Sequence, residues 1–305
     1  MNSSSSLVNE TTFPYAHWMN QIAELHARYE NAEPFPHIIL DDFIRPDMAE
    51  KALCEFPTLK SGKWTYYVHV NEKKFGKMDF HSFGPALQAL VTEFHSAEFI
   101  QFLTALTGIQ DIMPDPSLEG GGLHQSGPGG YLNVHADFTV HPIKRNWRRR
   151  INLILYLNKN WKDAYGGHLE LWDRQMKRRV HRVSPIFNRA VIFNTDPDSF
   201  HGFPDPIKCL PGMSRKSVAL YYFTQEKSVT VRSTEYRSRP GDGLKRFLIF
   251  LDKWVLRIYD QLKRRDVWGD RFASRLLKKV HHFQKRQEVI RKAKRIKSLT
   301  EKTSE

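Results

Sequence analysis

The alternation of apolar and polar residues divides the chain into a helix-rich first third and a strand-rich centre. Apolar side chains recur every three or four residues over residues 15–29, 47–56, 85–94 and 97–106, which predicts amphipathic helices. Pro46 precedes the second of these segments, and Gly108 follows the last at a position typical of a helix C-terminal cap. We expect these helices to form a scaffold against one face of a sheet.

Shorter apolar runs predict strands over residues 37–40, 64–70, 131–138 and 190–193, and another that begins at Arg215. Residues 154–173 are typical of two strands joined by a polar turn. The glycine-rich stretch EGGGLHQSGPGG, residues 119–130, is interpreted either as a loop that approaches a ligand closely or as a flexible connection.

A pair of potential metal ligands lies in the predicted strand YLNVHADF, residues 131–138. His135 and Asp137 are two residues apart, so their side chains leave the same face of a strand. Because an HxD tripeptide alone is weak evidence, a third ligand is needed. The best candidate is His201, which follows a strand and a loop rich in Pro, Asp and Ser. Two histidines and one carboxylate form the facial triad of non-haem Fe(II) oxygenases.

Other residues compete for the role of metal ligand. His141, His168 and His181 have no carboxylate two residues away on a comparable strand, so we expect them at the surface or the mouth of the site. Asp196 and Asp198 flank a proline shortly before His201, and we expect them to shape a turn.

A candidate carboxylate-binding residue follows His201 in the sequence. Fourteen residues later, Arg215 opens the apolar run RKSVALYYF, in which Ser217 projects from the same face. A guanidinium binds a planar carboxylate through two parallel hydrogen bonds, and the nearby hydroxyl can share that contact.

The order of these motifs resembles the Fe(II)/2-oxoglutarate dioxygenase superfamily, and more narrowly its prolyl 4-hydroxylase-like branch. The order is HxD, about sixty residues, His, then Arg-x-Ser in a strand. The segments ILYLNKNWKDAYGGHLELWD and FPHIILDDFIRPDMAEKALCEF are also similar to that branch, so the resemblance covers roughly residues 34–226. It implies an α+β fold with a double-stranded β-helix (jelly-roll) core.

The resemblance also implies the cofactors and further site residues. Fe(II) would be held by the two histidines and Asp137, and the distal carboxylate of 2-oxoglutarate by Arg215, Ser217 and Tyr156, with O2 as the second cosubstrate. Gln125 lies about ten residues before the first ligand, where the branch often has a tyrosine that lines the cosubstrate pocket.

Two further residues, Tyr131 and Asn133, alternate in phase with His135. Each either lines the cavity or is an ordinary strand residue.

The implied reaction is hydroxylation of an unactivated C–H bond with release of succinate and CO2, and ascorbate is a candidate reductant. A prolyl residue of a peptide or protein is the first substrate hypothesis. The long interval between His201 and Arg215 leaves a small molecule, a glycan or a lipid precursor open. A nucleic-acid demethylase of the same superfamily and a non-catalytic metal-binding β-barrel are the alternative classes.

Composition places the chain among globular proteins, with 40% hydrophobic and 12% aromatic residues. No run of 18 apolar residues and no N-terminal signal pattern is present, so we expect a cytoplasmic protein. Cys54 and Cys209 would form a disulfide only if they met in space, and a reducing compartment is the simpler expectation.

The formal net charge of +14 is concentrated near the C-terminus, because residues 228–305 hold 22 Lys and Arg against nine Asp and Glu. Two amphipathic helical stripes are predicted there, from Leu244 to Leu262 and from Trp268 to Phe283. This basic extension is expected to dock on the core, on a second subunit, on an anionic membrane as a peripheral contact, or on nucleic acid. The basic runs 144–150 and 174–182 either attract an anionic substrate or form a solvated face.

The predicted domain organisation follows from these segments. Residues 1–12 are expected to be disordered, 13–112 to form the supporting region, 113–227 the double-stranded β-helix core, and 228–305 the basic helical extension.

Overall fold

The computed structural model describes residues 11–61, 64–243, 246 and 249. Its α-helices match most of the predicted segments; they are α1 (Tyr15–Met19), α2 (Ile22–Glu30), α3 (Pro46–Cys54), α4 (Pro85–Phe94) and α5 (Ala97–Thr107). Gly108 caps α5 with φ of 71°, as its position in the sequence predicts.

The single helix predicted over residues 15–29 is wrong, because the chain breaks between α1 and α2. Gln21, with φ of −117° and ψ of 13°, leaves the helical conformation. The break lies between two buried anchors, Trp18 and Leu25, and the indole N–H of Trp18 donates to the carbonyl of Phe43 (3.0 Å). Packing therefore outweighs the continuous helical periodicity of this segment.

The strands form one curled antiparallel sheet in the order β1-β10-β7-β12-β5-β3-β6-β11-β8-β9, while β2, β4 and β13 pair beside this path. Their bounds are β1 (His37–Leu40), β2 (Thr65–His69), β3 (Glu72–Lys77), β4 (Met113–Pro114), β5 (Gly122–Ser126), β6 (Tyr131–Ala136), β7 (Trp147–Tyr156), β8 (Leu169–Trp172), β9 (Arg179–Val183), β10 (Arg189–Asn194), β11 (His201–Phe203), β12 (Arg215–Gln225) and β13 (Glu235–Tyr236).

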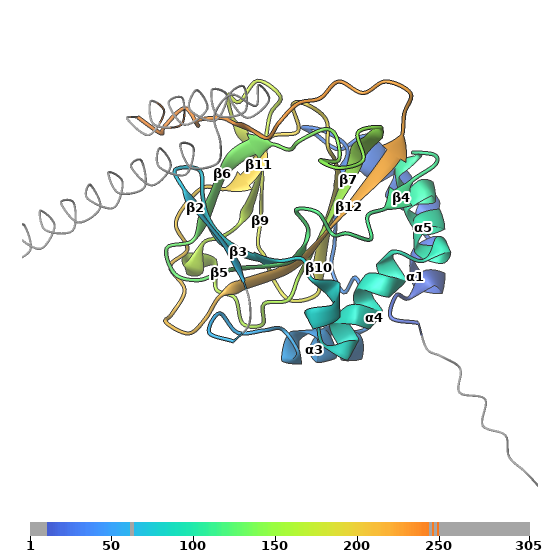
Figure 1. Ribbon diagram of the computed structural model, residues 1–305, viewed down its shortest axis with the longest axis horizontal. Helices are drawn as coiled ribbons and strands as arrows, with labels where there is room; N and C mark the ends of the chain where they lie inside the picture. Colours follow the sequence, from blue (N-terminus) through green and yellow to red (C-terminus); the bar gives the residue numbers. More distant parts are fainter. Residues whose placement is uncertain (1–10, 62–63, 244–245, 247–248, 250–305) are drawn as a thin grey trace, which may run out of the picture. The chain divides into compact units, whose positions relative to one another are not determined.

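Alternation along the central strands separates the scaffold from the interior of the curled sheet. On β7, Ile151, Leu153 and Leu155 belong to the main hydrophobic core, which the helices also build. Figure 1 shows α3, α4 and α5 along this side of β10, β7 and β12. The intervening residues Asn152 and Tyr156 therefore face the interior, where a site can form.

The loop interpretation of residues 119–130 is wrong for β5, which lies between β12 and β3. Its glycines allow close approach of neighbouring backbones. A Cβ on Gly122, which has φ of 80°, would lie 2.4 Å from the carbonyl oxygen of Lys77, and one on Gly121 would lie 2.7 Å from that of Ala219. The glycine-rich composition thus reflects strand packing in the sheet.

The C-terminal helical stripes predicted beyond Leu244 lie outside the described residues, apart from Arg246 and Ile249. Residues 228–243 are described, and part of this segment pairs with β6 as strand β13. In the described part of the chain, no helix has the length and apolar character needed to cross a membrane. Cys54 is exposed, Cys209 is buried, and both are free thiols.

Candidate active site

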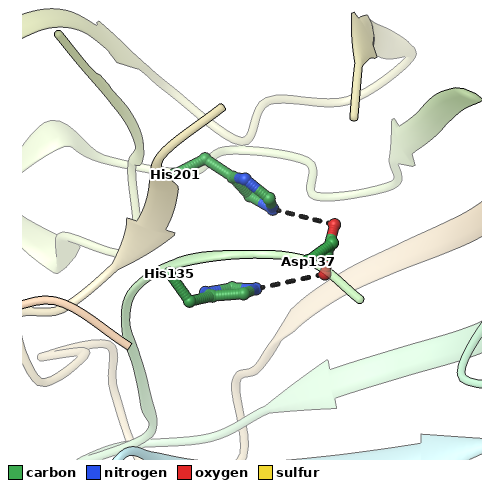
Figure 2. Close-up of side chains that lie close together, drawn as sticks. All are labelled: His135, Asp137 and His201. Carbon is green, nitrogen blue, oxygen red and sulfur yellow. Dashed lines mark ion pairs between the residues drawn. The ribbon is translucent and has the colours of Figure 1, made fainter. Parts of the chain in front are cut away.

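Three potential metal ligands converge in the interior of the curled sheet (Figure 2). His135 is near the end of β6, Asp137 follows that strand, and His201 begins β11 directly opposite His135. Nε2 of His135 lies 3.4 Å from Oδ1 of Asp137, and Nε2 of His201 lies 3.5 Å from Oδ2. Within the described residues, no other group of His, Cys, Asp and Glu side chains is arranged to hold a metal ion.

Backbone carbonyls orient both imidazole rings. Nδ1 of His135 donates to the carbonyl of Asn133, and Nδ1 of His201 donates to that of Ser199, each at 2.9 Å. Because a carbonyl only accepts, each Nδ1 carries a proton, so Nε2 is the atom that presents a lone pair when the ring is neutral. Burial, together with nearby His135, lowers the pKa of His201 to about 4, so this ring is neutral at neutral pH. This is the tautomer and charge state that a metal ligand requires.

A β-bulge brings two further polar side chains to Asp137. The register of β7 against β12 shifts between Tyr222 and Phe223. Arg149 and Asn152 are three residues apart, a spacing that regular alternation would place on opposite faces of the strand. The bulge turns both toward the same carboxylate.

These two side chains hold Asp137 as an oriented carboxylate. Nη2 of Arg149 lies 2.9 Å from Oδ2 of Asp137, and Nδ2 of Asn152 donates to the same oxygen at 2.7 Å. Burial opposes the charge, but the guanidinium of Arg149 and the ring of His201 hold the pKa of Asp137 well below its usual value. Arg149 itself is buried and stacks on Tyr221, with Cζ 3.4 Å from the ring centroid. The site therefore presents an ionised ligand oxygen in a fixed position.

A second buried arginine, Arg215, has no carboxylate partner in the described part of the chain. Its Nη2 donates to the hydroxyl of Tyr156 (2.9 Å), and its Nε donates to the carbonyl of Gly167 (2.7 Å). Its Cζ lies 4.3 Å from the ring centroid of Phe203, which is two residues from His201 on β11. Burial lowers the pKa of Arg215, so an anion bound here would offset the cost of this isolated charge.

Strand pairing determines which residues share the face of Arg215. Ser217 follows two residues later on β12 and lies opposite both Tyr156 of β7 and His124 of β5. Burial, together with nearby Lys74, lowers the pKa of His124 to about 3, so its ring is neutral. Ser217, Tyr156 and His124 therefore lie on the same face of the sheet as Arg215.

The sequence-predicted contact Gln125 lies on the opposite face of β5. It is paired with Lys216, and its amide nitrogen donates to Oγ of Ser214 at 2.6 Å. Because residues alternate along a strand, the neighbouring His124, and not Gln125, lies on the face of the sheet that carries Arg215.

Tyr131 and Asn133 both bind the turn between β2 and β3. The hydroxyl of Tyr131 donates to the carbonyl of Val70 (3.3 Å), and Nδ2 of Asn133 donates to the same carbonyl (3.2 Å) and to Oδ1 of Asn71 (3.1 Å). These contacts favour the interpretation of Tyr131 and Asn133 as strand-supporting residues.

The competing histidines lie apart from the metal cluster. The expected surface position is wrong for His141 and His168, which are buried in contact with carboxylates: their Nε2 atoms lie 3.3 Å from Asp115 and 2.6 Å from Asp163. Nε2 of His181 is 2.9 Å from a backbone carbonyl. The pairing of buried imidazoles with acids explains two of these histidines without a metal.

The turn before His201 is shaped by its acidic residues, as predicted. The backbone N–H groups of Ser199 and Phe200 donate to the carbonyls of Asp196 (3.1 Å) and Asp198 (2.9 Å).

Several arginines of the two basic runs form ion pairs. Arg148 and Arg150 lie 3.3 Å and 3.6 Å from Glu226. The other pairs are Arg174 with Asp198, Arg179 with Glu170 and Arg182 with Asp163. Attraction of an anionic substrate by these runs stays a prediction.

The donor set fits an iron centre, since two imidazole Nε2 atoms and one carboxylate oxygen converge within 4.8 Å. The uncompensated guanidinium of Arg215 fits a carboxylate ligand. Two histidines and one carboxylate are the ligand set that non-haem Fe(II) oxygenases use.

The model of the 2OG-Fe(II) oxygenase superfamily matches residues 121–223 of the chain. This match supports the predicted superfamily, and the double-stranded β-helix fold is confirmed. Iron(II), 2-oxoglutarate and O2 are the cofactor and cosubstrates that give this superfamily its name and chemistry.

A segment of 57 residues is 42% identical to Prolyl 3-hydroxylase OGFOD1 of Mus musculus, covering 17% of this chain and 10% of that protein. The match therefore spans about a tenth of that curated relative's length.

The prolyl hydroxylase of Trichoplax adhaerens, solved with a hypoxia inducible factor oxygen degradation domain peptide fragment, has the same fold. It is 18% identical with a TM-score of 0.51, over 68% of this chain and 92% of that one. A Pseudomonas putida prolyl-4-hydroxylase is 17% identical with a TM-score of 0.46, over 67% and 100% of the two chains.

Proposed function

We propose that this protein is an Fe(II)- and 2-oxoglutarate-dependent hydroxylase that acts on a prolyl residue of a peptide or protein. The observation that carries this proposal is the convergence of His135, Asp137 and His201 in one interior with the unpaired guanidinium of Arg215. A metal-binding barrel without catalysis would have no use for an isolated buried cation beside the metal ligands.

The metal would be held by Nε2 of both histidines and by the carboxylate of Asp137. A set of two histidines and one carboxylate would leave coordination positions for a cosubstrate and O2. Arg149 and Asn152 keep the carboxylate in place, and the two backbone carbonyls keep the imidazoles turned toward it.

The distal carboxylate of 2-oxoglutarate would bind Arg215, with the hydroxyls of Tyr156 and Ser217 beside it. The tyrosine hydroxyl already accepts from Arg215 and has its own proton to donate. Bound iron supplies the oxidation in which O2 and 2-oxoglutarate convert a C–H bond to C–OH, leaving succinate and CO2. Asp137 occupies a coordination position that a halide would need, which favours hydroxylation over halogenation.

Aromatic side chains limit access of water to this interior. Phe203 packs on Arg215, and Phe193 packs edge-on against His201, with ring centroids 4.7 Å apart. Exclusion of water strengthens the interaction between Arg215 and a bound carboxylate.

The prolyl substrate is supported by the match to the mouse prolyl 3-hydroxylase, in which a segment of 57 residues is 42% identical. Ascorbate is proposed as the reductant that restores Fe(II) after an uncoupled turnover.

The test is incubation of the full chain with Fe(II), 2-oxoglutarate, ascorbate and a library of proline-containing peptides. We expect selected peptides to gain the mass of one oxygen atom, with one succinate formed per hydroxylated product. Matched peptides with alanine in place of proline serve as controls, and NMR of the product assigns C3 or C4. Oxidation that persists in the alanine peptides, or an absence of oxidised product while 2-oxoglutarate binds normally, would contradict a prolyl substrate.

A further inference from the structure

The segment that follows β12 crosses beside the metal-bearing strand. We call residues 228–243 the strap. Within it, strand β13 pairs with β6, so that Glu235 lies opposite Ala136 and Tyr236 lies opposite His135. The backbone N–H of Arg237 donates to the carbonyl of Val134 at 2.8 Å. The strap therefore pairs directly with the end of β6 that carries a candidate ligand.

Without the strap, this end of β6 would have an open edge. Strand β3 pairs with Tyr131 and Leu132 of β6, and the N–H of Asn133 donates to the carbonyl of Asn71 (2.8 Å), while β11 lies along the other side of β6. An unpaired edge exposes backbone N–H and C=O groups to water and to foreign strands. By pairing near His135, the strap closes the remaining half of this edge.

A second group of contacts ties the strap to the loop after Asp137. The backbone N–H of Thr139 donates to the carbonyl of Arg232 (3.1 Å), and Oγ1 of Thr139 donates to the carbonyl of Thr230 (2.8 Å). The same Oγ1 accepts from the N–H of Arg232 (3.0 Å). Because Asp137 lies beyond the end of β6, these bonds stabilise the chain on the far side of that ligand.

The distal part of the strap is anchored by Arg239. Its guanidinium lies 2.8 Å from Asp205, 3.8 Å from Glu170 and 3.3 Å from Asp242. Glu170 belongs to β8, and Asp205 follows β11, so these contacts fix the strap to β8 and to the chain that follows β11. The strap is thus bound at both ends and at its centre.

The side chain at the centre of this strand faces the candidate ligand. The rings of Tyr236 and His135 have centroids 5.4 Å apart and are tilted by 39°. Nδ1 of His135 makes one hydrogen bond, to the carbonyl of Asn133. A single hydrogen bond does not fix the plane of the imidazole ring, so packing must limit its orientation. Tyr236 supplies packing on one side, and His201 lies close by, with a ring centroid 4.5 Å away.

We propose that the strap is an integral wall of the metal site and that Tyr236 is a positioning residue for His135. This inference rests on the proposed function, because it assigns the strap a role toward the metal that His135 would bind. The ring of Tyr236 limits the orientations of the imidazole, and the bonds at Thr139 limit movement of the loop that carries Asp137. The residues that define the metal site therefore extend beyond the last strand of the double-stranded β-helix.

The experiment titrates the full metal-free chain with Co(II), whose visible absorption reports the number and geometry of its ligands. We expect Tyr236→Ala to bind Co(II) about tenfold more weakly than wild type and with an altered spectrum. This factor is at the lower end of the loss in metal affinity, about 10- to 100-fold, that follows removal of a residue that supports a metal ligand. Tyr236→Phe keeps the ring and should retain wild-type affinity and spectrum. Tyr236→Leu fills much of the space without a planar ring and should also weaken binding, which keeps the test valid if the alanine variant unfolds.

Tyr66→Ala is the matched control, because Tyr66 is 51% exposed on β2 and stacks on Phe75. It should bind Co(II) as wild type does. Wild-type affinity and spectrum in both Tyr236→Ala and Tyr236→Leu would overturn the role of the strap while leaving the metal site intact. Failure of the wild-type chain to bind Co(II) would instead overturn the proposed metal site itself and, with it, the role assigned to Tyr236.

Discussion

Replacement of Asp137 by asparagine is expected to abolish hydroxylation and to weaken Fe(II) binding on the order of 100-fold or more. The change removes the negative charge of the ligand set, and loss even of a residue that merely supports a metal ligand costs about 10- to 100-fold. Asparagine keeps an oxygen near Asn152 and Arg149, which limits the disturbance of the fold. Metal affinity is measured by anaerobic titration, and turnover by succinate formation.

The matched control for this substitution is Asp198→Asn. Asp198 forms an ion pair with Arg174 in the turn before His201, and its side chain is 39% exposed. It should retain activity and metal affinity, because an exposed ion pair contributes only about 0–1 kcal/mol. Full turnover in Asp137→Asn would contradict the assignment of the carboxylate ligand.

Replacement of Arg215 by methionine is expected to weaken 2-oxoglutarate binding at least about 30-fold while leaving Fe(II) affinity near that of wild type. Loss of one partner of a buried charge pair costs about 2 kcal/mol or more, which corresponds to this factor. No carboxylate of the described chain pairs with Arg215, so its removal deprives a bound anion of its charged partner, while the Gly167 carbonyl and the Tyr156 hydroxyl each lose a hydrogen-bond donor. The measurements are the 2-oxoglutarate Kd under anaerobic conditions and the KM during turnover.

Two variants define the specificity of this effect. Arg215→Lys should bind 2-oxoglutarate with intermediate affinity, because lysine keeps the charge but loses the planar pair of donors. Arg182→Met removes a guanidinium that pairs with the exposed Asp163, and it should leave 2-oxoglutarate binding unchanged. Equal 2-oxoglutarate affinity in wild type and Arg215→Met would show that the cosubstrate binds elsewhere.

The three candidate ligands could be predicted from the sequence because each is indicated by its position relative to a single strand. Alternation placed His135 beside Asp137, and an isolated histidine after a buried strand indicated His201. The same alternation placed Ser217 on the face of Arg215, and the structure has these residues on one face. In regular strands, the sequence therefore predicts which side chains of a site share a face.

The residues that support Asp137 were not predictable in this way. Arg149 belonged to a basic run expected either to attract an anionic substrate or to form a solvated face, yet it is buried with Asn152 because the register of β7 shifts. A bulge inverts the face of every residue beyond it, and the sequence of β7 contains no glycine that would indicate one. The available signal was Asn152, an amide within the apolar run of residues 151–156.

The strap was missed for a related reason. Residues 228–243 were grouped with the basic extension by charge, whereas its place is determined by backbone pairing of two residues, Glu235 and Tyr236, with β6. Such a short strand has too few residues to show alternation. Long-range pairing of this kind is set by the completed sheet and is absent from local sequence patterns.

The central claim is that this interior binds Fe(II) and 2-oxoglutarate together. Its most direct test is anaerobic addition of Fe(II) and then 2-oxoglutarate to the full metal-free chain, monitored by visible absorption. We predict the weak charge-transfer band of a keto acid chelated to ferrous iron, with loss of the band in Asp137→Asn and a higher 2-oxoglutarate requirement in Arg215→Met. Absence of the band in folded, iron-loaded wild-type protein would contradict the proposed centre.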